Sequence, residues 1–206
     1  MQIAFVLLIG GLAGMSAGML QNSLLEGKPG PGGYARNFYG DWKFISAVII
    51  TAGIALLIYR TAGSTFQTLH MGILVLLLEL AAVYDLQQGI IPDGLIAVGM
   101  VAGFGTLMID PGASPLDSAA GGIGVGILMA LVSLLTKNGL GMGDAKLFAC
   151  IGVFLGLGQT LTVAVLSIIL SGVAGVILLA RDRGNKNRTI PLAPLMLLGV
   201  VLTIIF

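Results

Sequence analysis

Residues 139–148 read GLGMGDAKLF, and they place Asp144 at the head of an apolar run that continues to residue 180. A membrane span needs only ~20 apolar residues, so this run is too long for one helix across a bilayer. The stretch GLGQT at 156–160 interrupts the run with two glycines, which weaken a helix interior. We therefore predict two tight spans here, at 145–158 and 160–180, with Asp144 at a membrane boundary. The first would rise only about 21 Å through a core of ~30 Å.

The composition of the whole chain is that of a membrane protein. Of its 206 residues, 57% are hydrophobic and only 9% are charged, unlike a soluble domain with its charged surface. We predict an all-α, polytopic integral membrane protein with about eight transmembrane helices. Residues 1–206 are expected to form a single transmembrane domain, in which 21–43 is a flexible connector rich in glycine and proline. The spans are expected at 2–20, 44–60, 67–84, 94–109, 119–136, 145–158, 160–180 and 190–206.

The basic residues predict the orientation, because lysine and arginine concentrate in cytoplasmic loops. With eight spans and the N-terminus outside, nine of the ten basic residues fall on one side, and Arg60 alone falls on the other. The cytoplasmic side would then hold the loops 21–43, 85–93, 137–144 and 181–189. We expect a multi-pass protein of the inner (cytoplasmic) membrane with lipid as a partner. A net charge of +1 gives no indication of nucleic-acid binding.

Glycine is abundant, with 32 residues, and this suits helices that associate in a bilayer through small side chains. The best candidates for such packing are Gly10, Gly14 and Gly18 in the first span, and Gly122 with Gly126 in the fifth. The single cysteine and the single histidine argue against a disulfide framework or a zinc site. We therefore predict no metal.

Two aspartates stand out among the nine acidic residues. Asp85 ends the third span and Asp144 opens the sixth, so both fall at the cytoplasmic boundary although they are 59 residues apart. If they meet, their like charges cannot both ionise easily, and the pair shares a proton. Such a pair can hydrolyse an amide, because one member takes a proton from water while the other polarises the carbonyl. Asp144 begins a helix, whose dipole favours the anion, so Asp144 is the expected base.

The glycines before Asp144 have two readings. Gly139, Gly141 and Gly143 lack a Cβ, so their backbone can adopt positive φ and a substrate strand can approach the carboxylates. The alternative, which we hold equally open, is a flexible turn followed by a helix-capping aspartate. A dinucleotide-binding loop is not indicated, because no strand precedes these glycines.

At these residues the chain resembles the prepilin peptidases, or type IV leader peptidases, which are GxGD membrane aspartyl proteases. YDLQQGIIPD (84–93) resembles the family's Asp and Pro-Asp segment, and GMGDAKL (141–147) resembles its Gly-x-Gly-Asp-x-Lys segment. IPLAPLMLLG (190–199) and IGGLAGMSAGMLQNSL (9–24) resemble its closing and opening helices. The resemblance implies that Asp85 and Asp144 are catalytic and that these motifs supply supporting or substrate-binding residues, namely Gly141, Gly143, Lys146, Pro92 and Asp93. It also implies cleavage of basic leaders from prepilins or pseudopilins at the cytoplasmic face.

The chain departs from the family pattern between the first two spans. Many members carry two Cys-x-x-Cys pairs there, associated with N-methylation from S-adenosylmethionine, whereas 21–43 contains no cysteine. This departure favours proteolysis over methyl transfer and argues against zinc, so we predict no cofactor.

Several residues also have plainer interpretations. Pro-Asp commonly starts a helix, so Asp93 is expected to cap one. Glu79, deeper in its span than Asp85, is expected to be a neutral acid bonded to a neighbouring helix. Lys146 can extend its amine to the interface. His70, about 22 Å from Asp85 along the helix, cannot join the pair.

Other functions compete with the aspartic endopeptidase. A preflagellin-type or other GxGD protease would use the same chemistry. An ion- or proton-coupled transporter would use Asp85 and Asp144 as ion sites, but both lie at one boundary and the chain shows no inverted repeat. A scaffolding membrane subunit would need the two aspartates only for stability.

Overall fold

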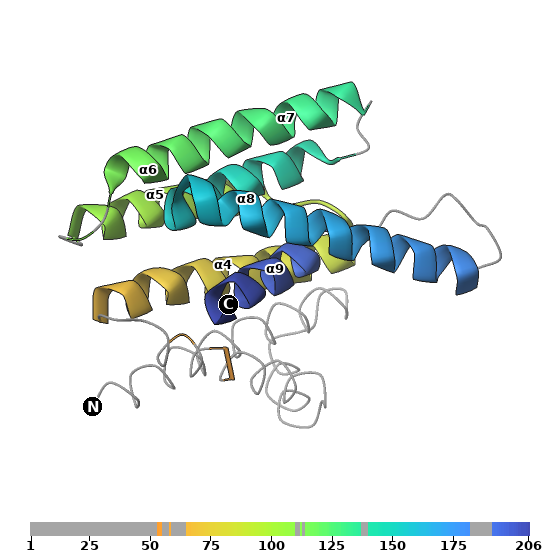
Figure 1. The fold of residues 1–206 in the computed structure, drawn as a ribbon, viewed down its shortest axis with the longest axis horizontal. Coiled ribbons are helices and arrows are strands. Elements are labelled where there is room, and N and C mark those ends of the chain that lie inside the picture. Colours follow the sequence, from red (N-terminus) through yellow and green to blue (C-terminus); the bar gives the residue numbers. More distant parts are fainter. Residues whose placement is uncertain are drawn as a thin grey trace, which may run out of the picture. The chain divides into compact units, whose positions relative to one another are not determined.

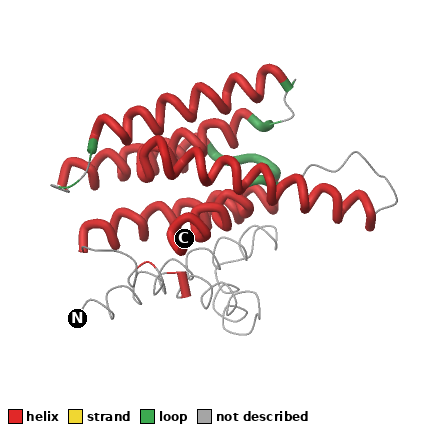
Figure 2. Tube along the Cα trace, in the orientation of Figure 1, coloured by secondary structure: helices red, strands yellow, loops and turns green. Residues whose placement is uncertain are grey.

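The computed structural model describes most of the chain after residue 64. Every regular element within this part is a helix, and short loops join the helices (Figure 2). The first predicted span, the connector 21–43 and most of the second span lie outside the described residues. The chain divides into two compact units, and the second consists of Ile73–Ile204 with Phe206. The described residues are 53–54, 58, 65–109, 112, 114–136, 140–181 and 191–206.

The helices agree well with the predicted spans (Figure 1). Three described stretches are long and apolar enough to cross a membrane: Phe66–Leu86, Pro115–Leu135 and Met142–Ile177. The all-α class is therefore confirmed for the described residues, while the count of eight spans stays a prediction. The elements are α4 (Thr65–Gln88), α5 (Asp93–Ile109), α6 (Pro115–Ala119), the π-helix η1 (Ala120–Val125), α7 (Gly126–Leu135), α8 (Met142–Arg181) and α9 (Ala193–Ile205).

The break predicted in the long apolar run is confirmed. Helix α8 is interrupted at Gly156, where φ is 75° and ψ is −177°, a conformation that favours glycine. The backbone N–H of Leu157, exposed by the break, donates to Asp117 Oδ1 at 3.2 Å. Figure 1 shows the chain reversing direction here, so α8 consists of two helical segments that run back along each other. An aspartate from the loop predicted to lie outside thus supports the turn.

The first segment of α8, residues 142–155, is the centre of this unit. It packs against α5, α6, η1 and α7, and its side chains are buried nearly all round, with Leu147, Phe148, Cys150 and Ile151 fully inaccessible. At 1.5 Å per residue this segment is only about 21 Å long. Because protein surrounds this segment, the segment does not need to be long enough to cross the whole hydrocarbon core.

Small residues set the distance between α8 and its neighbours. Gly121 of η1 and Gly152 of α8 face each other backbone to backbone, so a Cβ on either would overlap the other. Gly122 and Gly126 also face α8, where a Cβ would come within 2.8 Å of Val153 Cγ2 and 2.7 Å of Ala149 Cβ respectively. The prediction that these two glycines mediate helix packing is confirmed, and it reflects close approach of backbones in a bilayer bundle.

Replacement of Gly152 by alanine is expected to destabilise the protein. The added Cβ would overlap the Gly121 backbone, and overpacking of this kind costs about 1–3 kcal/mol. Thermal unfolding in detergent micelles should show a clearly lower Tm for Gly152→Ala. Gly124→Ala is the matched control on η1, since its Cβ would make only an ordinary contact, 3.7 Å from Leu157 Cδ1. Equal Tm values for the two variants would contradict this packing.

Candidate active site

Asp85 lies in the last turn of α4 and is held by the start of α9. Helix α4 ends at Gly89, which has a φ of 64° and donates its N–H to the Asp85 carbonyl at 2.9 Å, a common helix C-terminus. The Asp85 side chain is only 9% exposed. Its Oδ2 accepts the N–H of Ala193, the first residue of α9, at 2.9 Å. The carboxylate thus satisfies one of the N–H groups that a helix start leaves without an intrahelical partner.

Sequence analysis missed Ala193. The prolines in IPLAPL at 190–195 are typical of a helix start, so the N-terminus of α9 could have been placed from sequence. Its partner could not, because Asp85 lies 108 residues earlier in the chain.

Asp144 lies in the first turn of α8 and turns back over the residue that precedes the helix. Its carboxylate interacts with the backbone N–H of Gly141, and the Gly141 carbonyl accepts the Ala145 N–H at 3.2 Å. A Cβ on Gly141 would lie 2.8 Å from Asp144 Oδ2. This is one half of a capping box, in which an acid three residues into the helix reaches back to the N–H of the capping residue; Gly141 has no side chain to form the other half. The helix-capping alternative is therefore correct as a description of local structure.

The expected positive φ is wrong for Gly141 and Gly143. Among the described residues the left-handed glycines are Gly89 and Gly156, and Gly139 lies outside the described part. Gly141 matters for a different physical reason, because an added Cβ there would crowd the Asp144 carboxylate. Gly143 faces the 89–92 loop, where a Cβ would make ordinary contacts of 3.7 Å with Ile91 Cβ and 3.9 Å with its backbone N.

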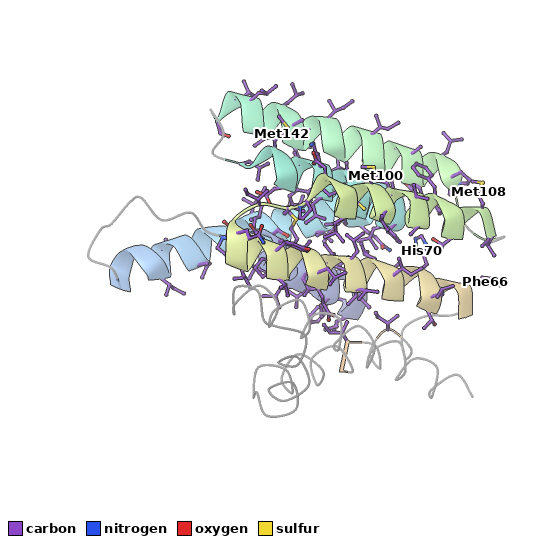
Figure 3. The ribbon with its side chains drawn as sticks, turned by 180° about the vertical axis from the view of Figure 1, so that it is seen from behind. Phe66, His70, Met100, Met108 and Met142 are labelled. Carbon is purple, nitrogen blue, oxygen red and sulfur yellow. The ribbon has the colours of Figure 1, made fainter. Side chains whose placement is uncertain are left out.

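The two aspartates come together at one end of the unit. The Asp85 carboxylate is near enough to act electrostatically on Asp144, although α5, α6, η1 and α7 separate them in the chain. Asp85 is buried and Asp144 is half-buried. Figure 3 shows Met142, at the start of α8, at this end, and Met108, near the end of α5, at the other. In the part of the chain that is described, no cluster of histidine, cysteine and acidic side chains could hold a metal ion.

Pro92, Asp93 and Lys146 border the aspartates. The Pro92 carbonyl accepts the N–H of Leu95 at 3.0 Å, so Asp93 is the first residue of α5 rather than its cap. The Asp93 carboxylate instead forms an ion pair with Lys146, with Oδ1 and Nζ 2.7 Å apart. Lys146 therefore does not simply extend into the interface, and it pairs with Asp93 rather than with Asp144.

Three further residues with polar or reactive side chains, Cys150, Glu79 and His70, are buried. Cys150 is fully buried and faces Gly99 of α5, so it fills space between α8 and α5. Glu79 is buried in α4, with 8% of its surface exposed, and its predicted neutral state stays a prediction. His70 lies in α4 and is also buried.

The chain belongs to the type IV leader peptidase family, whose model matches residues 72–177. Three curated relatives share the printed name prepilin leader peptidase/N-methyltransferase. The protein of Bacillus subtilis (strain 168) is 26% identical over 81% of this chain and 67% of its own length. The proteins of Legionella pneumophila and Neisseria gonorrhoeae are 27% and 28% identical over 65% and 68% of this chain.

The chain spans only 48% of the Legionella relative and 43% of the Neisseria relative. No solved structure matches the chain significantly. The match to the family includes α4 from Gly72, α5, the helix 115–135 and most of α8, and therefore both aspartates.

Two substitutions of Asp85 should distinguish the effect of its hydrogen bond on stability from the effect of its charge. Asp85→Ala leaves the buried Ala193 N–H without its acceptor, which costs about 1–3 kcal/mol. Asp85→Asn keeps an acceptor oxygen and should lose less stability. Thermal unfolding in detergent should therefore rank the proteins wild type, Asp85→Asn, Asp85→Ala in order of falling Tm. An alanine variant as stable as the asparagine variant would show that the bond to α9 does not form.

Proposed function

We propose that this protein is a membrane aspartic endopeptidase that removes the basic leader from type IV prepilins or pseudopilins. The observation that carries the proposal is the meeting of Asp85 and Asp144, whose carboxylates interact electrostatically at one end of the helical unit. Membership of the type IV leader peptidase family supports peptide hydrolysis as the reaction.

In the proposed reaction the two carboxylates share one proton, because two like charges that lie close to each other do not both ionise easily. The ionised member takes a proton from water, and the water oxygen forms a bond to the scissile carbonyl carbon. The protonated member gives its proton to the carbonyl oxygen. When the tetrahedral intermediate collapses, one of its hydroxyl protons returns to the carboxylate that had acted as the acid. The C–N bond breaks, and the amine leaves with the proton that the base had taken.

Helix dipoles do not indicate which aspartate acts as the base and which as the acid. The sequence favoured Asp144 as the base because it begins a helix. However, Asp85 also accepts a backbone N–H at a helix start, that of α9, so a position at a helix start does not distinguish the two aspartates.

The substrate and the membrane face of the proposal come from two further observations. The curated relatives are named prepilin leader peptidases, which supports a prepilin as the partner over a preflagellin. In the predicted topology, the loops 85–93 and 137–144, which carry or adjoin the aspartates, belong to the side rich in lysine and arginine, which is the cytoplasmic side by the positive-inside rule. We therefore place the site at the cytoplasmic face of the inner membrane.

The relatives' name also includes N-methyltransferase. We propose proteolysis alone for this chain, because the connector 21–43 contains no cysteine and the cysteine-rich segment associated with methyl transfer is not present there.

Neither aspartate should be replaceable by asparagine. With the protein co-expressed with a prepilin, an immunoblot should show the mobility shift of leader removal for the wild type. Asp85→Asn and Asp144→Asn should each abolish it, because either amide removes the shared proton from the pair. A fully processed prepilin in either variant, at wild-type enzyme level, would end the proposal.

Gly141→Ala should impair the reaction with little loss of stability. The new Cβ would press on Asp144 Oδ2, and a carboxylate displaced by about 1 Å can cost 100-fold in rate. We expect prepilin processing by purified enzyme to slow by at least tenfold. Gly105→Ala in α5 is the control, since its Cβ would meet no atom within 4 Å, and it should keep most of the activity. Full activity in Gly141→Ala would refute this role of the glycine.

A further inference from the structure

The ion pair between Asp93 and Lys146 joins the two segments that carry the aspartates. Lys146 lies two residues after Asp144, on the first turns of α8. Asp93 begins α5, directly after the loop 89–92 that follows Asp85 and the end of α4. Their charged atoms are 2.7 Å apart, although the residues are 53 positions apart in the chain. The ion pair therefore links the segment that follows Asp85 directly to the helix that carries Asp144.

Two other contacts hold the segment between Asp85 and Asp93 in place. At the α4 end, the N–H of Gly89 donates to the Asp85 carbonyl. In the middle, Ile91 is buried, with 6% exposed, and packs close to Gly143, the residue before Asp144. The ion pair adds the third attachment, at the end of the loop where α5 begins. With it, the segment 89–93 is held at both ends and in the middle.

We propose that Asp93 and Lys146 are a positioning pair, which sets the distance between the carboxyl groups of Asp85 and Asp144 and does not itself react. The proposal rests on the proposed peptidase function.

Loss of the ion pair should affect the reaction rate much more than the stability of the fold, and this difference distinguishes a positioning role from a structural one. The side chains of Lys146 and Asp93 are 48% and 74% exposed, and exposed ion pairs contribute little to the stability of a fold. A reaction that depends on the placement of two groups is far more sensitive, since a shift of about 1 Å can change the rate 100-fold. Loss of the pair should therefore lower the rate and leave the fold intact. Because both charges are exposed, salt should weaken the pair.

The test is a charge-swap cycle measured by steady-state kinetics in detergent, with a purified prepilin as substrate. Asp93→Lys and Lys146→Asp should each lower kcat about tenfold or more, with KM and Tm close to wild type. The double variant Asp93→Lys/Lys146→Asp should recover most of the loss, and Lys146→Arg should stay near wild type. The control is Gly94→Ala beside Asp93, where an added Cβ meets no atom within 4 Å, and its kcat should not change.

Three outcomes would overturn the positioning role. One is wild-type kcat in both single variants. Another is a double variant as slow as the single ones. The third is a raised KM with unchanged kcat in Lys146→Asp, which would mean that the lysine binds substrate directly.

A second measurement does not depend on cleavage. Amide hydrogen exchange in 86–92 should be faster in Lys146→Met than in wild type, because the loop loses its attachment at α5. Unchanged exchange would also overturn the inference. Failure of the wild type to cleave any prepilin would instead refute the proposed function, while hydrogen exchange would still report on the pair.

Discussion

A carboxylate at the edge of a bilayer bundle needs hydrogen-bond donors, and three aspartates in this protein obtain them from the starts of helical segments. Asp85 accepts from Ala193 at the start of α9. Asp144 interacts with the N–H of Gly141 ahead of α8, and Asp117 accepts from Leu157 where α8 resumes. Each N–H has no partner within its own helix, and burial of Asp85 or Asp144 without a donor would be costly. The position of each aspartate therefore depends on where a helical segment begins, and the start of that segment depends on the aspartate as an acceptor.

This dependence explains why the reactive end of the unit can be built from distant parts of the chain. The first segment of α8 is enclosed by α5, α6, η1 and α7, with glycines at the closest crossings. Its N-terminus is thereby fixed beside the end of α4, and α9 adds a donor from the far end of the sequence. Two acids that repel each other can be kept together because helix starts favour negative charge and because the surrounding packing is dense.

Much of this arrangement could be predicted from the sequence, and the failures have physical causes. Apolar length and the GLGQT interruption located the helices and the break at Gly156. Charge bias and span counting placed Asp85 and Asp144 at one boundary. Positive φ was wrongly expected at Gly141, because the sequence does not reveal that the Asp144 side chain folds back over it. The bond from Ala193 to Asp85 and the pair of Asp93 with Lys146 depend on tertiary contacts across many residues, which local patterns do not encode.

The central claim is that residues 85 and 144 lie together, and cysteine cross-linking in native membranes tests it most directly. In a Cys150→Ala background, Asp85→Cys/Asp144→Cys should form an internal link on oxidation or with a short thiol cross-linker, detected by mass spectrometry of the linked peptides. Alkylation of each single-cysteine variant first establishes that both thiols react. The control pair Asp85→Cys/Asp117→Cys should not link, because 117 lies at the other end of the first α8 segment, about 20 Å away by helical rise. No link between 85 and 144, or equal linking in the control pair, would contradict the account.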